Sequence, residues 1–298
     1  MARTGVPGLD DVLSGGLTAG RLFLLEGSPG TGKTTMAMRF LMDGAAQGEK
    51  TLYVTLSETE QELRSSAASY GWTFDDKVKI FELVPPESLL DADQQQSLLY
   101  SSDLELGETT KLIFDAVEQS KATRIVLDSL SEIRLLAQSS LRYRRQVLAL
   151  KHYFARRGAT VLMLDDLTTE SNDKTVHSIA HGVIRLEEVA PDYGPERRRL
   201  RVIKYRARGF RGGYHDFVIR GDGVSVFPRL VSAEHRRKFT RDRLGNRGRR
   251  SRCASRRRHR TGLQHPAVGA GRFRQEPAHP AVCQVDARTR SKGCDVHL

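Results

Sequence analysis

The first 252 residues of this 298-residue chain contain no cysteine, and all three cysteines lie near the end, at Cys253, Cys283 and Cys294. A body without cysteine has no disulfide framework and needs no oxidising compartment. The sequence also lacks an apolar N-terminal signal and any run of ~18 apolar residues, which disfavours secretion and a membrane-spanning helix. These absences predict a cytoplasmic protein that does not contact a membrane.

The body of the chain also lacks an excess of positive charge, although the formal net charge is +12. Residues 1–235 hold 30 Lys+Arg against 32 Asp+Glu, which leaves 18 basic and 4 acidic residues for 236–298. A surface that follows nucleic-acid phosphates needs clustered basic side chains. We therefore disfavour nucleic acid as a partner of residues 1–235.

Residues 236–298 differ in composition from the body, with 16 Arg, 2 Lys and no helical or strand periodicity. One interpretation is a disordered basic arm that binds nucleic acid or an anionic surface. The favoured one is an out-of-frame remnant of a second domain. Permitted codons for Val268–Pro277, read one base later, can spell Ser-Gly-Pro-Gly-Gly-Ser-Gly-Lys-Ser-Leu, a phosphate-binding loop. The cysteines and histidines of this tail do not have the spacing of a zinc site.

The most informative motif is Gly27–Thr34, which fits G-x-x-x-x-G-K-[ST]. An apolar run of strand length, Arg21–Glu26, precedes it, and Thr35–Leu41 has the pattern of an amphipathic helix. In that context backbone N–H groups at a helix N-terminus wrap a polyphosphate, a lysine reaches the β and γ phosphates, and a hydroxyl holds Mg²⁺. The candidate ATP-binding residues are Gly27, Ser28, Pro29, Gly30, Thr31, Gly32, Lys33, Thr34 and Thr35.

Strands and helices alternate through most of the body, which predicts a mainly parallel sheet with helices on both faces. Further strands are predicted at Lys50–Leu56, Val78–Leu83, Arg124–Asp128 and Ala159–Asp165, and helices at Glu60–Tyr70, Thr110–Ser120 and Leu141–Arg156. From Gly182 onward, short strands at Gly182–Glu188, Leu200–Lys204, Phe217–Ile219 and Val224–Phe227 predict an antiparallel extension. Pro85–Gly107 lacks clear periodicity and is expected to be an exposed excursion. Residues 1–235 are predicted to form one α/β domain.

Carboxylates at strand ends are candidates for the metal and for water activation. Asp128 ends a predicted buried strand and is expected to hold Mg²⁺ together with Thr34. Ser129 is either a γ-phosphate sensor or a helix cap. Glu58 is the candidate general base for the attacking water, the alternative being an acid that favours a helix N-terminus. Asp165 and Asp166 are expected to position the water network.

Two cations near the end of a predicted strand are candidates for stabilising charge on the γ phosphate from a neighbouring subunit. Lys204 ends the predicted strand Leu200–Lys204, and Arg206 follows two residues later. Because side chains two residues apart point to the same side of a strand, the two cations are expected to share one face. The run Arg197–Arg199 is expected to be a solvated face.

Taken in order, these motifs resemble the RecA-superfamily ATPases of the KaiC type. The resemblance spans residues 3–235 and includes Gly27–Thr34, Thr55-Leu56-Ser57-Glu58-Thr59, Tyr70-Gly71-Trp72, Ile125–Leu130, His181–Glu187 and Val202–Arg206. It implies a RecA-like core, ATP held between the subunits of a ring, typically hexameric, and action of Lys204 and Arg206 on a neighbour's nucleotide. Family members often carry paired glutamates where this chain has Ser57 and Glu58, so turnover is expected to be slow or differently arranged.

The leading hypothesis is a Mg²⁺-dependent, ring-forming signalling ATPase with an unidentified partner protein. One alternative is a RecA- or RadA-like DNA-dependent ATPase, whose DNA loop would fall at Leu167–Lys174. Another is a nucleotide switch that does not hydrolyse ATP. A third is a serine/threonine autokinase, since many members of the family have two domains in tandem and that activity usually belongs to the second.

Overall fold

A computed structural model of the chain describes residues 1–74, 76–83, 98–167, 175–190 and 193–230, with side chains of the 98–120 segment described from residue 106. The predictions for the tail at 236–298 lie outside the described residues. The same holds for nearly all of the segment Leu167–Lys174, so the proposed DNA loop is not described either. In the described part no helix is long and apolar enough to cross a membrane.

The described strands form one sheet, in the order β3-β2-β4-β5-β1-β6-β7-β8-β9. Neighbouring strands from β3 to β6 in this order are parallel, whereas the pairs β6–β7, β7–β8 and β8–β9 are antiparallel. This mainly parallel α/β sheet with an antiparallel extension is the RecA-like fold expected from the sequence. The strands are β1 (Leu22–Gly27), β2 (Thr51–Thr55), β3 (Val78–Glu82), β4 (Arg124–Asp128), β5 (Thr160–Asp166), β6 (Gly182–Val189), β7 (Arg197–Tyr205), β8 (His215–Arg220) and β9 (Gly223–Phe227).

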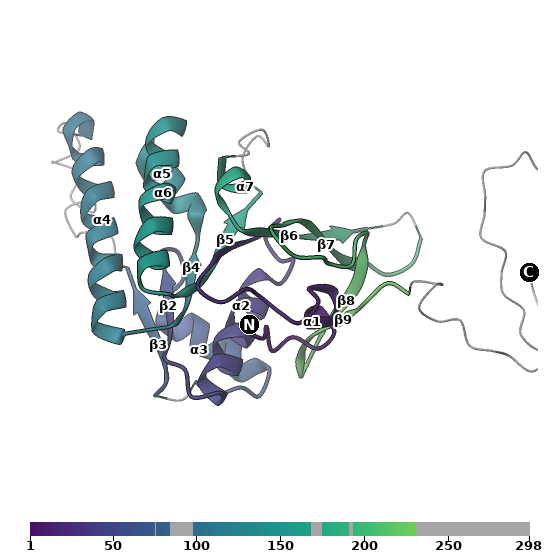
Figure 1. Cartoon of the computed structure of the whole chain (residues 1–298). Coiled ribbons are helices and arrows are strands. Elements are labelled where there is room, and N and C mark those ends of the chain that lie inside the picture. Colours follow the sequence, from purple (N-terminus) through teal and green to yellow (C-terminus); the bar gives the residue numbers. More distant parts are fainter. Residues whose placement is uncertain (75, 84–97, 168–174, 191–192, 231–298) are drawn as a thin grey trace, which may run out of the picture. The chain divides into compact units, whose positions relative to one another are not determined.

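Helices cover both faces of the parallel strands (Figure 1). One face packs against α1 (Leu9–Val12), α2 (Lys33–Ala46) and α3 (Glu60–Ser69), and the other against α4 (Leu98–Ser120), α5 (Leu130–Ala137), α6 (Ser140–Arg156) and α7 (Thr175–Ile179). Successive side chains of a strand point to opposite faces of the sheet, so each strand contributes to both apolar cores. In β1, for example, Phe23 and Leu25 belong to the first apolar core, whereas Leu22 and Leu24 belong to the second.

Several regions differ from the sequence prediction. Helix α4 begins at Leu98, so the expectation of an excursion through Gly107 was wrong for its last ten residues. Gly107 lies inside this helix, where glycine lowers helix propensity, and so it masked the pattern that continues to the buried Ile113 and Val117. Helices α1, α5 and α7 were not predicted, because all three are short.

The arginine run was assigned to a solvated face, which is wrong in part. Arg197–Arg199 opens β7, and the side chains of Arg198 and Arg199 pair with Glu188 and Glu187 on β6 at 2.7 and 2.8 Å. These cross-strand pairs fix the register at the outer end of the β6–β7 ribbon.

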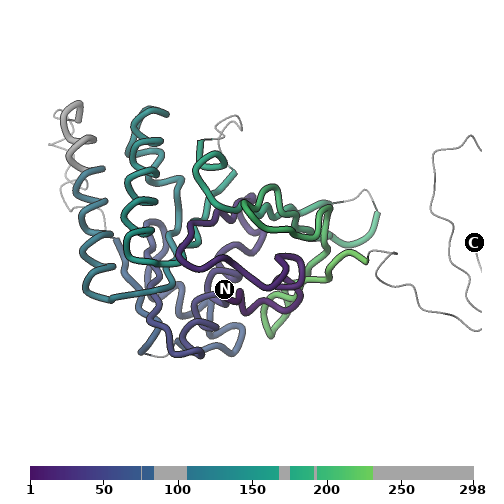
Figure 2. Tube along the Cα trace, in the orientation of Figure 1, coloured from purple at the N-terminus to yellow at the C-terminus, as the bar shows by residue number. Residues whose placement is uncertain are grey.

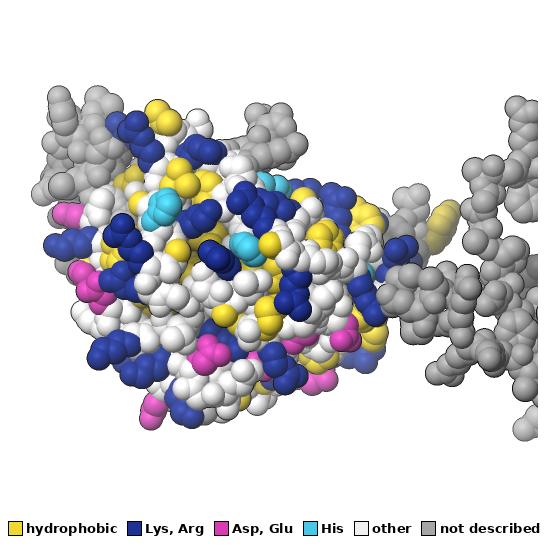
Figure 3. Space-filling model, in the orientation of Figure 1, with side chains coloured by type: hydrophobic (Ala, Val, Ile, Leu, Met, Phe, Trp, Pro, Cys, Tyr) yellow, Lys and Arg dark blue, Asp and Glu magenta, His cyan; other side chains and the backbone are white. Residues whose placement is uncertain are grey.

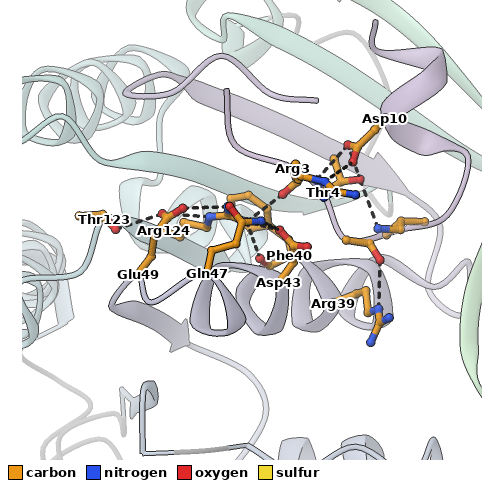
Figure 4. A network of polar contacts seen from close by, with 12 residues as sticks. Arg3, Thr4, Asp10, Arg39, Phe40, Asp43, Gln47, Glu49, Thr123 and Arg124 are labelled. Carbon is orange, nitrogen blue, oxygen red and sulfur yellow. Dashed lines mark hydrogen bonds and ion pairs between the residues drawn. The ribbon is translucent and has the colours of Figure 1, made fainter. Parts of the chain in front are cut away.

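A buried arginine joins α2, β4 and the N-terminal segment (Figure 4). The Arg124 side chain is fully buried, and its guanidinium lies 3.1 Å from Asp43 and 2.8 Å from Glu49. It also donates to the backbone carbonyl of Arg3 at 2.8 Å. A buried charge is tolerated when it is paired and fully hydrogen-bonded, as this one is.

The residues before β1 lie against the antiparallel extension, as Figure 2 shows for the purple N-terminal trace beside the green strands. Val226 N–H donates to the Pro7 carbonyl at 2.9 Å. Gly8 has a φ of +78°, and a Cβ there would lie 2.0 Å from the Val226 carbonyl oxygen. Only glycine permits this approach of the lead-in to β9.

Candidate nucleotide-binding site

The phosphate-binding loop lies between the C-terminal end of β1 and the first turn of α2, in the strand–loop–helix context expected from the sequence. Gly30 and Gly32 have φ values of +81° and +97°, which favour glycine. A Cβ on Gly27 would lie 2.8 Å from the carbonyl oxygen of Leu186. The loop is closed internally by a 2.7 Å bond from the Thr31 hydroxyl to the Ser28 carbonyl.

Lys33 directs its ammonium group into this loop. Its Nζ donates to the carbonyls of Gly27 and Ser28 at 2.8 and 3.0 Å and lies 2.7 Å from Oδ1 of Asp166. The side chain is only 7% exposed. Parallel pairing of β1 with β5 sets Gly27 beside Asp166, which explains how that carboxylate reaches the loop. Sequence reasoning placed Asp166 near this edge but missed its pairing with Lys33.

Thr34 and Asp128, the two residues predicted to hold Mg²⁺, lie side by side. The Thr34 hydroxyl lies 3.4 Å from Oδ2 of Asp128, and the Tyr53 hydroxyl donates to the same oxygen at 2.5 Å. Burial raises the pKa of Asp128, against the hydrogen bond from Tyr53, which lowers it. Tyr53 was missed, because nothing in the sequence shows that β2 and β4 are neighbours.

A hydroxyl and a carboxylate in contact fit the oxygen ligands that Mg²⁺ prefers. In the described part there is no cluster of three or more His, Cys, Asp or Glu side chains that could hold a metal. The pair Thr34 and Asp128 is therefore the candidate metal site. A magnesium ion at such a site keeps several water molecules and binds substrate phosphates, so few protein ligands are needed.

Glu58 follows β2 and is half-buried, with Asp128, Asp166 and Lys33 among its charged neighbours. Burial raises its pKa, and the charges of Asp128, Glu62 and Asp166 raise it further, whereas Lys33 lowers it. Its backbone is held by Thr55, whose hydroxyl accepts from Glu58 N–H at 2.9 Å. Helix α3 begins two residues later, with Thr59 as its N-cap. Glu58 therefore lies one residue before the N-cap, at the N-terminal end of α3 but outside its first turn.

Lys204 and Arg206 contact the end of α7 and not the phosphate loop of their own chain. Lys204 Nζ donates to the carbonyl of His177, and Arg206 Nη2 donates to that of Ser178 at 2.6 Å. Strand β7 ends at Tyr205 and Arg206 directly follows it, and the two side chains reach neighbouring carbonyls of the same helix. The backbone turns after Tyr205, because Ala207 adopts a φ of +56°.

The remaining predicted residues lie around this centre. Thr35 is buried, with its hydroxyl 3.4 Å from that of Tyr70. Ser129 is buried at the start of α5, where its side chain makes no capping hydrogen bond. Asp165 pairs with Arg134 at 2.6 Å, which leaves Asp166 as the aspartate of this strand end that contacts Lys33.

A buried carboxylate directly before the loop was also missed. Glu26 of β1 is 2% exposed and bonds to Nε2 of His177 at 2.6 Å and to Nε of Arg185 at 2.7 Å. These partners lower its pKa against the opposing effect of burial. Through His177, whose carbonyl accepts from Lys204, this carboxylate links the loop strand to α7.

Comparison with known proteins identifies the family of this chain. A UPF0273 protein of Pyrococcus horikoshii is 29% identical over 240 residues, which cover 77% of this chain and 94% of the relative. The circadian clock protein KaiC3 of Synechocystis is 29% identical over 232 residues, and the circadian clock oscillator protein KaiC of Parathermosynechococcus lividus is 30% identical over 238. The matched region covers 76% of this chain but only 45% and 42% of those two clock proteins. A family model described as the KaiC ATPase matches residues 2–231, and the chain therefore belongs to the KaiC-type ATPase family.

Proposed function

We propose that this chain binds Mg·ATP at Gly27–Thr34 and hydrolyses it between the subunits of a ring, typically hexameric, in a signalling role. The observation that carries the proposal is the convergence of Lys33, Thr34, Asp128 and Glu58 at one edge of the sheet. The family supports the general activity, and the residue roles below are our own assignments.

In the proposed mechanism the glycine loop and Lys33 bind the phosphates. Lys33 exchanges its contact with Asp166 for the β and γ phosphates, and backbone N–H groups at the start of α2 add further donors. Thr34 and Asp128 hold Mg²⁺, which neutralises charge on the phosphates when bound.

Glu58 accepts the proton of the attacking water in this mechanism. Its raised pKa makes it a stronger base than an exposed glutamate. Asp128 and Asp166 repel the charge on Glu58, so proton uptake is favoured. Ser57, which stands where family members often have a second glutamate, is exposed and supplies no second carboxylate.

Lys204 and Arg206 are assigned to the γ phosphate of an adjacent subunit. In their own chain they contact carbonyls of α7, and neither forms an ion pair with a described carboxylate. Their charges are therefore available to a negatively charged group on a neighbour.

The test compares turnover by the full chain with its Glu58→Gln and Glu60→Gln variants. Glu60 is a matched control, because it is an acid of the adjacent α3 that pairs with Arg64 at 2.7 Å. We expect Glu58→Gln to lower kcat about a hundredfold or more while ATP still binds. Glu60→Gln should retain turnover. Tight binding of ATP by wild type without any turnover would contradict hydrolysis and favour the nucleotide switch.

A further inference from the structure

A cavity of about 120 Å³ lies at the N-terminal ends of the parallel strands. Arg21 and Leu22 at the start of β1 line it, with Ala159 before β5 and His181 before β6. The phosphate loop follows the opposite end of β1, so this cavity is a separate place in the fold. A single buried water needs only about 10–15 Å³ by the same measure, so the cavity has room for a phosphate-sized group.

Cationic side chains from three parts of the fold surround this cavity. Besides Arg21, its lining includes Lys151 of α6 and Arg206 after β7, and Lys204 lies close to both of these side chains. In the described part no carboxylate forms an ion pair with any of these four side chains. The face in Figure 3 agrees, since Lys, Arg and His side chains gather over the region of α6, α7 and β6 with few Asp or Glu among them.

The structural alternative is that the cations only cap α7. Lys151, Lys204 and Arg206 do donate to the last carbonyls of that helix, at Ile179, His177 and Ser178. Those carbonyls carry only partial charges, and a helix of five residues has a weak dipole. Among the described residues, therefore, no carboxylate compensates the three full positive charges. Burial and then the charge of Arg206 lower the pKa values of both Lys151 and Lys204. The second cause reflects repulsion between these like charges.

His181 adds a titratable group to the wall of the cavity. Its ring packs edge-on against Phe23 at 5.6 Å and Tyr205 at 5.8 Å, between centroids. Burial lowers its pKa, followed by the charges of Arg21, Arg206, Lys151 and Lys204. No hydrogen bond to this imidazole is formed by any residue the structure describes.

We propose that the cavity lined by Arg21, Lys151, His181 and Arg206 is a second anion site, which binds a phosphate-type oxyanion. An oxyanion there would supply the missing negative charge and accept hydrogen bonds from several donors at once. It would also favour protonation of His181, so binding should take up a proton.

Two sources could provide this anion, and they share one chemistry. One is the terminal phosphates of a nucleotide held by a second copy of the chain, which rests on the interface proposed above. The other is a free phosphate compound. Direct binding of an inorganic anion tests the site without requiring turnover, so failure of either proposal can be recognised separately.

Calorimetric titration of the full chain with pyrophosphate is the primary test, using Lys33→Ala to remove binding at the phosphate loop. We expect this variant to retain one site, and Arg21→Gln in the same background to lower its affinity about tenfold or more. Arg21 is exposed, and its one described hydrogen bond is made by its backbone carbonyl, so a change of the side chain spares the fold. Arg156→Gln is the matched control, because Arg156 is an exposed arginine on α6 that does not line the cavity.

Sulfate provides the pH test, because its charge is constant through the neutral range. Its affinity should rise as the pH falls in Lys33→Ala and stay nearly flat when His181→Asn is added. The proposal would be overturned if folded Lys33→Ala bound no pyrophosphate. It would also be overturned if neither Arg21→Gln nor Lys151→Met weakened that binding. In either case the cations would only cap α7.

A mixing experiment distinguishes the two sources. Lys33→Ala chains, with the cavity intact, are combined with ATP-loaded chains that carry Arg21→Gln and Lys151→Met. If the two kinds of chain associate and pyrophosphate inhibits this association, the anion is the nucleotide of a second copy. Pyrophosphate binding without such association identifies a free phosphate compound.

Discussion

The Tyr53 hydroxyl and the Thr34 hydroxyl meet at a single oxygen, Oδ2 of Asp128, at 2.5 and 3.4 Å. Tyr53 belongs to the strand next to β4, so the sheet itself orients the carboxylate. The buried Tyr53 hydroxyl thus holds a carboxylate of the candidate metal site in place, a role that the phosphate-loop motif alone does not predict.

Removing this phenol should weaken the metal site and leave the phosphate loop in place. For Tyr53→Phe we expect the Mg²⁺ concentration at half-maximal turnover to rise about tenfold or more, as for other residues that orient metal ligands. Tyr153→Phe is the control, since that hydroxyl bonds to the Phe114 carbonyl at 2.7 Å in the other helical layer. Equal Mg²⁺ dependence in the two variants would refute the orienting role.

Asp128 is expected to lower the stability of the nucleotide-free chain at neutral pH. Burial raises its pKa above the ordinary 3.8, so the folded state binds a proton more tightly than the unfolded state. The free energy of unfolding therefore falls as the pH rises from about 4 through the folded pKa. Asp128→Asn should be more stable than wild type at pH 7, with the difference vanishing near pH 4. Denaturant unfolding at both pH values measures this, and a less stable variant at pH 7 would mean that the hydrogen bonds to the charged carboxylate outweigh its burial.

Arg124 should contribute strongly to stability without acting on ATP. Arg124→Met leaves Asp43 and Glu49 without their buried partner, and we expect the free energy of unfolding to fall by about 3 kcal/mol. Arg145→Met, at an exposed position on α6, should change it little. Chemical denaturation of the two variants provides the comparison, and similar midpoints would show that the ion pairs do not offset the cost of burying Arg124.

Local motifs made part of this site predictable, and the order of the strands limited the rest. The loop from Gly27 to Thr34 and the strand end at Asp128 could be recognised, because each is marked by residues that are neighbours in the sequence. The contacts Tyr53–Asp128 and Lys33–Asp166 depend on which strands are neighbours, and a sequence of alternating strands and helices does not specify that order. The contacts of Arg206 were missed for a related reason, since the end of β7 is set by a turn with positive φ at Ala207, which has no glycine to mark it.

Mixing two inactive variants tests the central claim of hydrolysis between subunits most directly. Lys33→Ala disables a chain's own loop, and Arg206→Ala removes the cation assigned to its neighbour's nucleotide. Each variant alone should turn over ATP slowly. A mixture should regain activity, because the intact loop of one variant can meet the intact Arg206 of the other. A mixture no more active than the sum of its parts, with both variants folded, would contradict action of Arg206 on a neighbouring nucleotide.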